Sequence, residues 1–300
     1  MSHYQLSFEE QEYLSKYDIS QYARPSLATD MAIYSIFAEA KDNIRKLPKQ
    51  ELKLLLIKRA NYPYLNHWAL PGGFCRPTED VYETAKRELF EETNVQNAYL
   101  NLVGTFGEVN RDPRGWIISN TFLALIDAKS CALRAGTDAW EAKWFTVELS
   151  RKQLRKEIGE NGANIETEYE LNLVHEESDI RLSAKLIEHK QFCNYHETVH
   201  YEIIESHQIA FDHAKLILYT LLALRENVKK DSKLVFDLLP ELFTLTQLQN
   251  AFELILEEKL LTPNFRRKIA DYVIETDQSV EGAGHRPAKL FKRNIEEFYR

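Results

Sequence analysis

The chain has 300 residues, of which 44% are hydrophobic and 28% are charged, and its net charge is −8. These values fit one large or two ordinary globular domains, and the negative charge argues against indiscriminate nucleic-acid binding without excluding a local basic patch. The N-terminus is polar, and Cys75, Cys131 and Cys193 are too far apart to form a disulfide framework. We therefore expect a cytoplasmic protein with no membrane partner.

The first part of the chain predicts a short helix followed by strands. Ser7 and Glu10 have the spacing of a capping box, which would open a helix that ends near Lys16. Runs of apolar and β-branched residues then predict strands over 27–37 and 52–59, with a charged loop between them.

The stretch 71–95 contains the most informative pattern of the sequence. The glycines Gly72 and Gly73 form a turn, and the residues from 79 to 93 include neither Gly nor Pro. This predicts a loop that enters a helix, with Thr78 as the N-cap.

Three carboxylates fall together on one face of that helix: Glu88, Glu91 and Glu92. Like charges at this spacing are mildly destabilising, so a positive group among them is expected. Arg87 can hold one carboxylate in place, and a hard divalent ion can bind the rest. Because all the ligands are oxygens, Mg²⁺ or Mn²⁺ is the expected ion.

Further strands and a helix follow. We predict strands over 99–106, 117–125 and 140–147, then a polar segment over 148–164, a β-hairpin from the runs 166–174 and 181–188, a third run at 201–204, and a helix over 211–225. The mixture of strands and helices predicts an α/β sandwich. The first domain would span 1–229, with an inserted β-hairpin region at about 150–200.

The last seventy residues have a different pattern. A short helix over 234–239, a second from about 244 to 258, a third that begins at 262, and a hairpin formed by 272–275 and 288–292 predict a small winged helix-turn-helix domain over 230–300. Its basic residues are segregated near the start of the third helix and on the wing. The candidate DNA-binding residues are Asn264, Arg266, Arg267, Lys268, Arg286 and Lys289.

Several of these residues carry a resemblance to a known family. Gly73, Glu79, Arg87-Glu88, Glu91-Glu92 and Val95 stand at the spacing of the Nudix box, and Asn94 replaces the glycine expected after the last glutamate. The resemblance implies a hydrolase of nucleoside diphosphates linked to another group, with Arg87, Glu88, Glu91 and Glu92 in the catalytic centre. It also implies that Glu88, Glu91, Glu92 and the backbone of Gly73 bind the metal.

Both halves of the chain together resemble the Nudix-related transcriptional regulators of NAD metabolism. The segments that carry this resemblance are 22–26, 68–74, 111–115, 210–214, 264–268 and 284–288. The resemblance implies a Nudix α/β/α sandwich with a mixed sheet, which senses or cleaves ADP-ribose, followed by a winged helix that binds promoter DNA. A winged helix alone makes few base contacts, so a homodimer that reads two half-sites is expected.

The substrate contacts are candidates chosen by position. Arg111 and Arg114 flank a tight turn and can grip phosphate or ribose, although Arg111 can equally pair with Asp112. Arg24 and Arg59 are candidates to contact the adenine or the phosphates of the nucleotide, and Phe106 is a candidate to stack on its base. The sequence leaves open whether Glu108 or Glu141 is the general base, and it predicts His213 to be a hydrogen-bonded structural residue.

Two functions of different class follow. One is a DNA-binding regulator that uses ADP-ribose as its signal. The other is an ADP-ribose pyrophosphatase whose winged helix makes protein contacts only. The intact carboxylates favour hydrolysis, and the segregated basic residues favour DNA binding.

Overall fold

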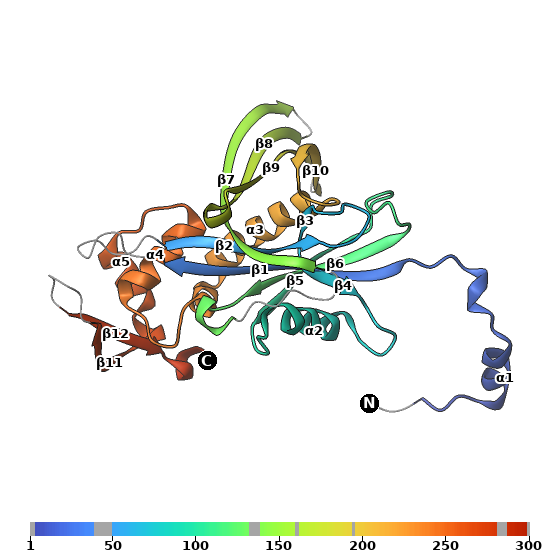
Figure 1. Ribbon diagram of the computed structural model, residues 1–300, viewed down its shortest axis with the longest axis horizontal. Helices are drawn as coiled ribbons and strands as arrows, with labels where there is room; N and C mark the ends of the chain where they lie inside the picture. The colour runs from blue at the N-terminus through green and yellow to red at the C-terminus, as the bar shows by residue number, and fades with distance from the viewer. Residues whose placement is uncertain are drawn as a thin grey trace.

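The computed structural model of the chain describes residues 4–38, 50–131, 139–159, 162–193, 196–280 and 287–298. A large sheet forms the centre, with α2 (Val81–Thr93) packed on one face and α3 (His213–Lys230) on the other (Figure 1). In these residues, no helix is long and apolar enough to cross a membrane.

The sheet is mixed, and its main strands follow the order β10-β9-β8-β7-β2-β1-β6-β5. β1 pairs with β6 in parallel and with β2 in antiparallel orientation. Together with the two helical layers, this confirms the expected α/β/α sandwich. The strands are β1 (Ser26–Ala38), β2 (Gln50–Arg59), β3 (Trp68–Ala69), β4 (Gly72–Phe74), β5 (Tyr99–Phe106), β6 (Ile117–Leu125), β7 (Ala139–Gly159), β8 (Gly162–His175), β9 (Ile180–Cys193) and β10 (His196–His207).

The central strand β1 is buried on both faces. Met31 belongs to the core that includes Leu89 of α2, whereas Tyr34 belongs to the core that includes Leu216 of α3. This division follows from the alternation of side chains along a strand, and burial of both faces explains the nearly continuous apolar run. The Tyr34 hydroxyl lies 3.0 Å from the hydroxyl of Thr220, which ties the strand to α3.

The strand predicted over 140–147 does not end before the polar segment over 148–164, as the sequence suggested it would. β7 continues through this segment to Gly159 and pairs with β8 from Thr146 onward, and β8, β9 and β10 extend the pairing into an antiparallel meander. The residues over 150–159 are exposed and polar, so the sequence lacks a strand pattern there. Cross-strand pairing overrides local propensity in such a position. The predicted hairpin is confirmed, with longer strands than expected.

The acidic helix α2 begins at Val81, two residues later than the predicted Thr78 cap requires. Asp80, and not Thr78, is its N-cap, because the Asp80 carboxylate accepts hydrogen bonds from the backbone of Tyr82 and Glu83. Glu83 completes a capping box. At the other end, Asn94 adopts the left-handed conformation with φ 58°, which is the role expected of it in place of glycine.

An N-terminal arm, residues 4–25, extends away from the body of the protein (Figure 1). It contains α1 (Phe8–Lys16), whose predicted capping box of Ser7 and Glu10 is confirmed, and the short 3-10 helix η1 (Ile19–Gln21). No residue of α1 is buried, and Phe8 has 77% of its surface exposed. The arm therefore has exposed apolar side chains that the rest of the chain does not cover.

The C-terminal residues form the expected winged helix domain. It comprises η4 (Ser232–Leu238), α4 (Leu245–Leu256), α5 (Thr262–Ile269), η5 (Ala270–Tyr272), β11 (Val273–Val280), β12 (Ala288–Arg293) and α6 (Ile295–Phe298). The basic residues 266–268 lie in the second half of α5, and not near its start as predicted, because the helix is only eight residues long.

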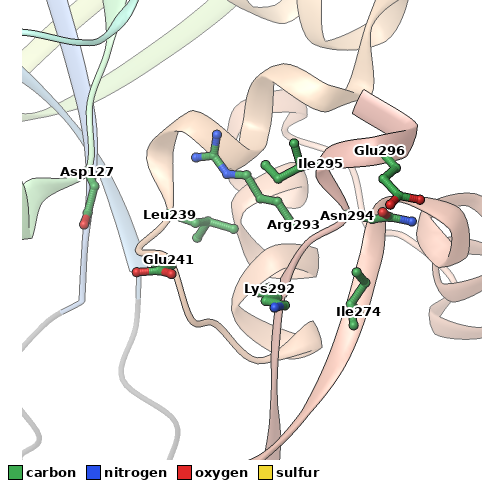
Figure 2. A pocket seen from close by; sticks show the side chains of 9 residues that line it. All are labelled: Asp127, Leu239, Glu241, Ile274, Lys292, Arg293, Asn294, Ile295 and Glu296. Atoms are coloured by element: carbon green, nitrogen blue, oxygen red, sulfur yellow. The ribbon is translucent and has the colours of Figure 1, made fainter. Parts of the chain in front are cut away.

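The winged helix domain packs against the first domain along one side. α4 contacts β2 and α3, and η4 contacts α3, so that Phe236 and Phe252 join the same core as Leu216. On another side, a groove of about 800 Å³ separates it from Asp127, just beyond the end of β6 (Figure 2).

Candidate functional site

Arg87 organises the carboxylates of α2. Its guanidinium donates two hydrogen bonds to Glu79, of 2.8 and 3.1 Å, and one of 2.5 Å to Glu88. The hydrogen bonds from Arg87 lower the pKa of Glu79, and those with Glu79 raise the pKa of Arg87. Glu79 is therefore a partner that fixes the arginine, while Arg87 also approaches Glu91 at 3.5 Å.

The predicted turn at Gly72 and Gly73 is wrong, because both residues belong to β4 and pair with β1. Glu88 lies beside Gly73. A Cβ atom added to Gly73 would collide with the Glu88 carboxylate, so only glycine leaves the space in which this carboxylate lies. Burial raises the pKa of Glu88, and its hydrogen bond with Arg87 offsets part of that effect. A buried carboxylate with only part of its charge balanced is suited to bind a cation.

Glu91 and Glu92 differ in exposure. The Glu91 side chain is 46% exposed and lies 3.7 Å from Arg76, whereas Glu92 is buried. Over the described ranges, no three acidic, His or Cys side chains already surround a common metal position. The three glutamates nevertheless fit a divalent ion, because all offer hard carboxylate oxygens, and the Glu88 carboxylate lies next to Gly73.

A cleft of about 220 Å³ opens next to Gly73. Its wall combines the two glycines of β4 with cationic and aromatic side chains from distant parts of the chain. These side chains include Arg59, Phe74, Arg111, Arg114, Phe211 and His213. Three arginines at one small cleft favour a ligand with several negative oxygens, such as a diphosphate.

Arg111 is held at the base of the cleft. Its side chain is 5% exposed and donates hydrogen bonds of 2.9 and 2.7 Å to the two oxygens of Asp212, and it lies 3.7 Å from Asp30. The alternative pairing with Asp112 is therefore wrong. Asp30 is a single acidic residue within the apolar run of β1, and this isolation was the one signal that pointed to a polar site there.

His213 is buried in the same network. Its Nδ1 accepts a hydrogen bond of 2.9 Å from the backbone of Leu70, and its Nε2 lies 3.6 Å from Asp30. Burial lowers the pKa of His213, more than the neighbouring carboxylates raise it. The ring therefore favours the neutral form with its proton on Nε2. This confirms the expected structural role and ties α3 to the segment that leads into Gly72.

Arg114 is the partner of Asp112. Its guanidinium donates hydrogen bonds of 3.0 and 2.7 Å to that carboxylate. Burial would raise the pKa of Asp112, but the hydrogen bonds from Arg114 outweigh burial and lower it. The guanidinium also lies 5.3 Å from the centre of the Phe74 ring and 5.2 Å from that of Phe211.

The other candidates lie elsewhere. Arg24 is exposed on the N-terminal arm, and Phe106 packs 5.0 Å from the ring of Tyr219 on α3, so neither lines the cleft. Glu108 pairs with Lys215 at 2.5 Å, and Glu141 pairs with Lys143 at 2.8 Å. Neither glutamate lines the cleft, and the choice of general base stays open.

The basic residues of the winged helix domain are divided between α5 and β12. Phe265 and Ile269 face the core, so the residues over 266–268 are exposed on the opposite face of α5. Asn264 accepts a hydrogen bond of 2.8 Å from Arg267. On β12, Lys289 pairs with Glu275 at 3.0 Å, and Arg286 lies outside the described residues.

Family models match both halves of the chain. Residues 44–165 match the NUDIX domain, and residues 235–292 match the NrtR DNA-binding winged helix domain. The ADPR responsive transcriptional repressor NtrR of Acinetobacter baylyi is 30% identical, with 96% of this chain and 90% of that protein covered.

Two further comparisons agree with this assignment. The ADP-ribose pyrophosphatase of Methanocaldococcus jannaschii is 37% identical over 39% of this chain and 69% of its own length. The structure of Shewanella oneidensis NrtR is 25% identical, covers 90% of this chain and 94% of its own, and superposes with a TM-score of 0.56. The chain therefore belongs to the NrtR family, in which a Nudix domain is joined to a DNA-binding winged helix domain.

Proposed function

We propose that the protein is an ADP-ribose-responsive transcriptional regulator that also hydrolyses ADP-ribose to AMP and ribose 5-phosphate. The observation that carries this proposal is the cleft lined by three arginines and by Gly73, which lies against the buried carboxylate of Glu88. The similarity to an ADP-ribose-responsive repressor over 96% of the chain supports the same ligand. The division into a Nudix domain over 1–229 and a winged helix domain over 230–300 belongs to this proposal.

The arginines of the cleft would have two different roles in binding the ligand. Arg59 and Arg114 stand at its wall and would contact the phosphate oxygens, where guanidinium groups form paired hydrogen bonds. Arg111, bound to Asp212, would act as fixed positive charge below them. Because these charges are in place before the ligand arrives, they need little rearrangement to stabilise the negative charge that develops during hydrolysis.

Divalent ions serve the Nudix superfamily in general, and here Mg²⁺ or Mn²⁺ is proposed. Glu88, Glu91 and Glu92, together with the backbone of Gly73, would hold the ion, and Arg87 would keep Glu88 in position. When bound, the ion would neutralise phosphate charge and lower the pKa of a water molecule. Hydrolysis would add water across the bridging P–O bond: one phosphorus would gain a new P–O bond as the bridging bond breaks, the proton lost by the water would go to a general base, and AMP and ribose 5-phosphate would be released.

The winged helix domain would bind promoter DNA through the exposed face of α5. This face exposes three consecutive basic residues, Arg266, Arg267 and Lys268, with Asn264 earlier in the same helix. These side chain types contact phosphates and base edges, while Lys289 on β12 would contact the flanking backbone. We assign the protein to the cytoplasm because promoter DNA and ADP-ribose are found there.

A homodimer is the proposed form on DNA. The N-terminal arm has exposed apolar residues such as Phe8, at 77% exposure, and Tyr13, at 64%, which a second copy would cover. Two copies related by a two-fold axis would also place two α5 helices on two half-sites.

The test is a titration of the purified protein with ADP-ribose and Mg²⁺, followed by chromatography for AMP. The Glu91→Gln variant keeps the shape of this side chain and removes its charge. Its turnover should fall by orders of magnitude while its thermal unfolding is unchanged. Full activity of the variant would refute α2 as the metal site. The alternative, a hydrolase with a winged helix for protein contacts, would be favoured by hydrolysis without saturable binding to any promoter fragment at low salt.

A further inference from the structure

Phe211 has an unusual backbone conformation at the junction of the cleft and α3. Its φ is 53°, in the left-handed region, where a bulky side chain is costly. Residues held in this region persist when their surroundings fix them, and they concentrate at binding and switch sites. Phe211 comes immediately before Asp212, the N-cap of α3.

The ring of Phe211 lies close to two arginines of the cleft. The guanidinium of Arg59 is 4.7 Å from the ring centre, and that of Arg114 is 5.2 Å from it. These are cation–π distances. Tyr64 packs against the same ring at 4.7 Å. Phe211 thus contacts both guanidinium groups, in addition to the hydrogen bonds from Arg59 to Pro63 and from Arg114 to Asp112. It also belongs to the segment that starts α3.

The neighbours of Phe211 are fixed more firmly than its ring. Ala210 donates a backbone hydrogen bond of 2.8 Å to Trp68 of β3, and Asp212 accepts two hydrogen bonds from Arg111. His213 holds the backbone of Leu70. Because Asp212 and His213 begin α3 and bind the cleft residues Arg111 and Leu70, a displacement of Phe211 would act on the contacts between the cleft and the first turn of that helix.

The helix that begins here ends at the winged helix domain. α3 is largely buried along its length and contacts η4 and α4 near its C-terminal end. Another part of the winged helix domain borders the groove at Asp127 (Figure 2). A small movement of α3 can therefore turn the domain toward or away from that groove, as packed helices do in shear motions.

We infer that Phe211 is the positioning residue of the cleft. It holds Arg59 and Arg114 for phosphate groups, and it moves the start of α3 when a ligand occupies the cleft. This inference rests on the proposed binding of ADP-ribose. Phosphate oxygens compete with the π face for both guanidinium groups, because charge-assisted hydrogen bonds are the stronger contacts. The bound ligand thus frees the ring from the arginines, and Phe211 relaxes together with the start of α3.

The experiment is hydrogen–deuterium exchange with and without ADP-ribose, in the Glu91→Gln background so that no ligand is consumed. Binding should protect the amides around Gly73 and change exchange in the first turn of α3 and in η4. Phe211→Leu keeps an apolar side chain and removes the π face, so protection at Gly73 should remain while the change in α3 and η4 is lost. Phe211→Tyr keeps the ring and should restore it.

The same variants give a second readout in DNA binding. Each cation–π contact changes an equilibrium constant by a few-fold, so two contacts together change it by about tenfold. Phe211→Leu should therefore reduce the effect of ADP-ribose on DNA affinity by about tenfold. Phe106→Leu is the matched control, since Phe106 also packs on α3 but is not among the residues of the arginine stack. It should respond like the parent.

The outcomes separate the two proposals. Protection at Gly73 in the parent without any change in α3, or a change of parental size in Phe211→Leu, overturns the role of Phe211 and leaves ADP-ribose binding in place. Absence of protection at Gly73 in the parent refutes the proposed function, and the role of Phe211 falls with it.

Discussion

Replacement of Gly73 by alanine isolates the position of the Glu88 carboxylate. The new Cβ atom would overlap one carboxylate oxygen of Glu88, and the side chain must turn away to relieve the contact. A carboxylate is the far end of a flexible side chain, so the unfolding free energy should change by less than about 1 kcal/mol. The catalytic carboxylate, however, would move by about 1 Å, and a misplacement of that size costs roughly 100-fold in rate.

The expected loss corresponds to about 2.7 kcal/mol of transition-state stabilisation. The assay is release of AMP from ADP-ribose at saturating Mg²⁺, alongside thermal unfolding of the same sample. Gly104→Ala is the matched control, because a Cβ atom there meets the Phe106 ring at 3.4 Å, an ordinary contact. Turnover of Gly73→Ala within threefold of the parent, in a correctly folded protein, would refute the assignment of Glu88 to the catalytic centre.

Three further outcomes are expected. Arg267→Ala should lower the slope of log affinity for operator DNA against log salt by roughly 0.9, if this residue contacts one phosphate, and the exposed Lys230→Ala, remote from α5, should leave the slope unchanged. Burial lowers the pKa of His213, so the unfolded chain binds more protons than the folded one and stability falls as pH drops below the ordinary value of 6.5. His213→Gln should reduce that pH slope by up to about 1.4 kcal/mol per pH unit in denaturant titrations between pH 5 and pH 7, and an unchanged slope would contradict burial of the neutral ring. Operator DNA should weaken ADP-ribose binding to the Glu91→Gln variant by the factor with which ADP-ribose weakens DNA binding, and equal nucleotide affinity with and without operator would exclude coupling.

The parts of the molecule that local patterns determine were predictable from the sequence. The acidic helix, the left-handed Asn94 and the strands β5 and β6 follow from residue periodicity and from the tolerance of Asn for positive φ. The winged helix domain likewise followed from three short helical patterns and a hairpin.

The parts that depend on distant partners were not predictable. The second half of β7 has a polar sequence, and it forms a strand because β8 pairs with it. The partner of Arg111 proved to be Asp212, 101 residues away, where local reasoning offered only the adjacent Asp112. The Nudix box located the catalytic end of the cleft, whereas its opposite wall required the start of α3, which no local spacing connects to β4.

The N-terminal arm has a consequence for regulation by abundance. If two copies cover each other's arms, the species that binds an operator forms in proportion to the square of the monomer concentration, so occupancy rises more steeply with protein level than for a monomeric repressor. Phe8 and Tyr13 then set the concentration at which the regulator begins to act. A cell could adjust the threshold of the response by changing expression alone, without any change in affinity for the nucleotide.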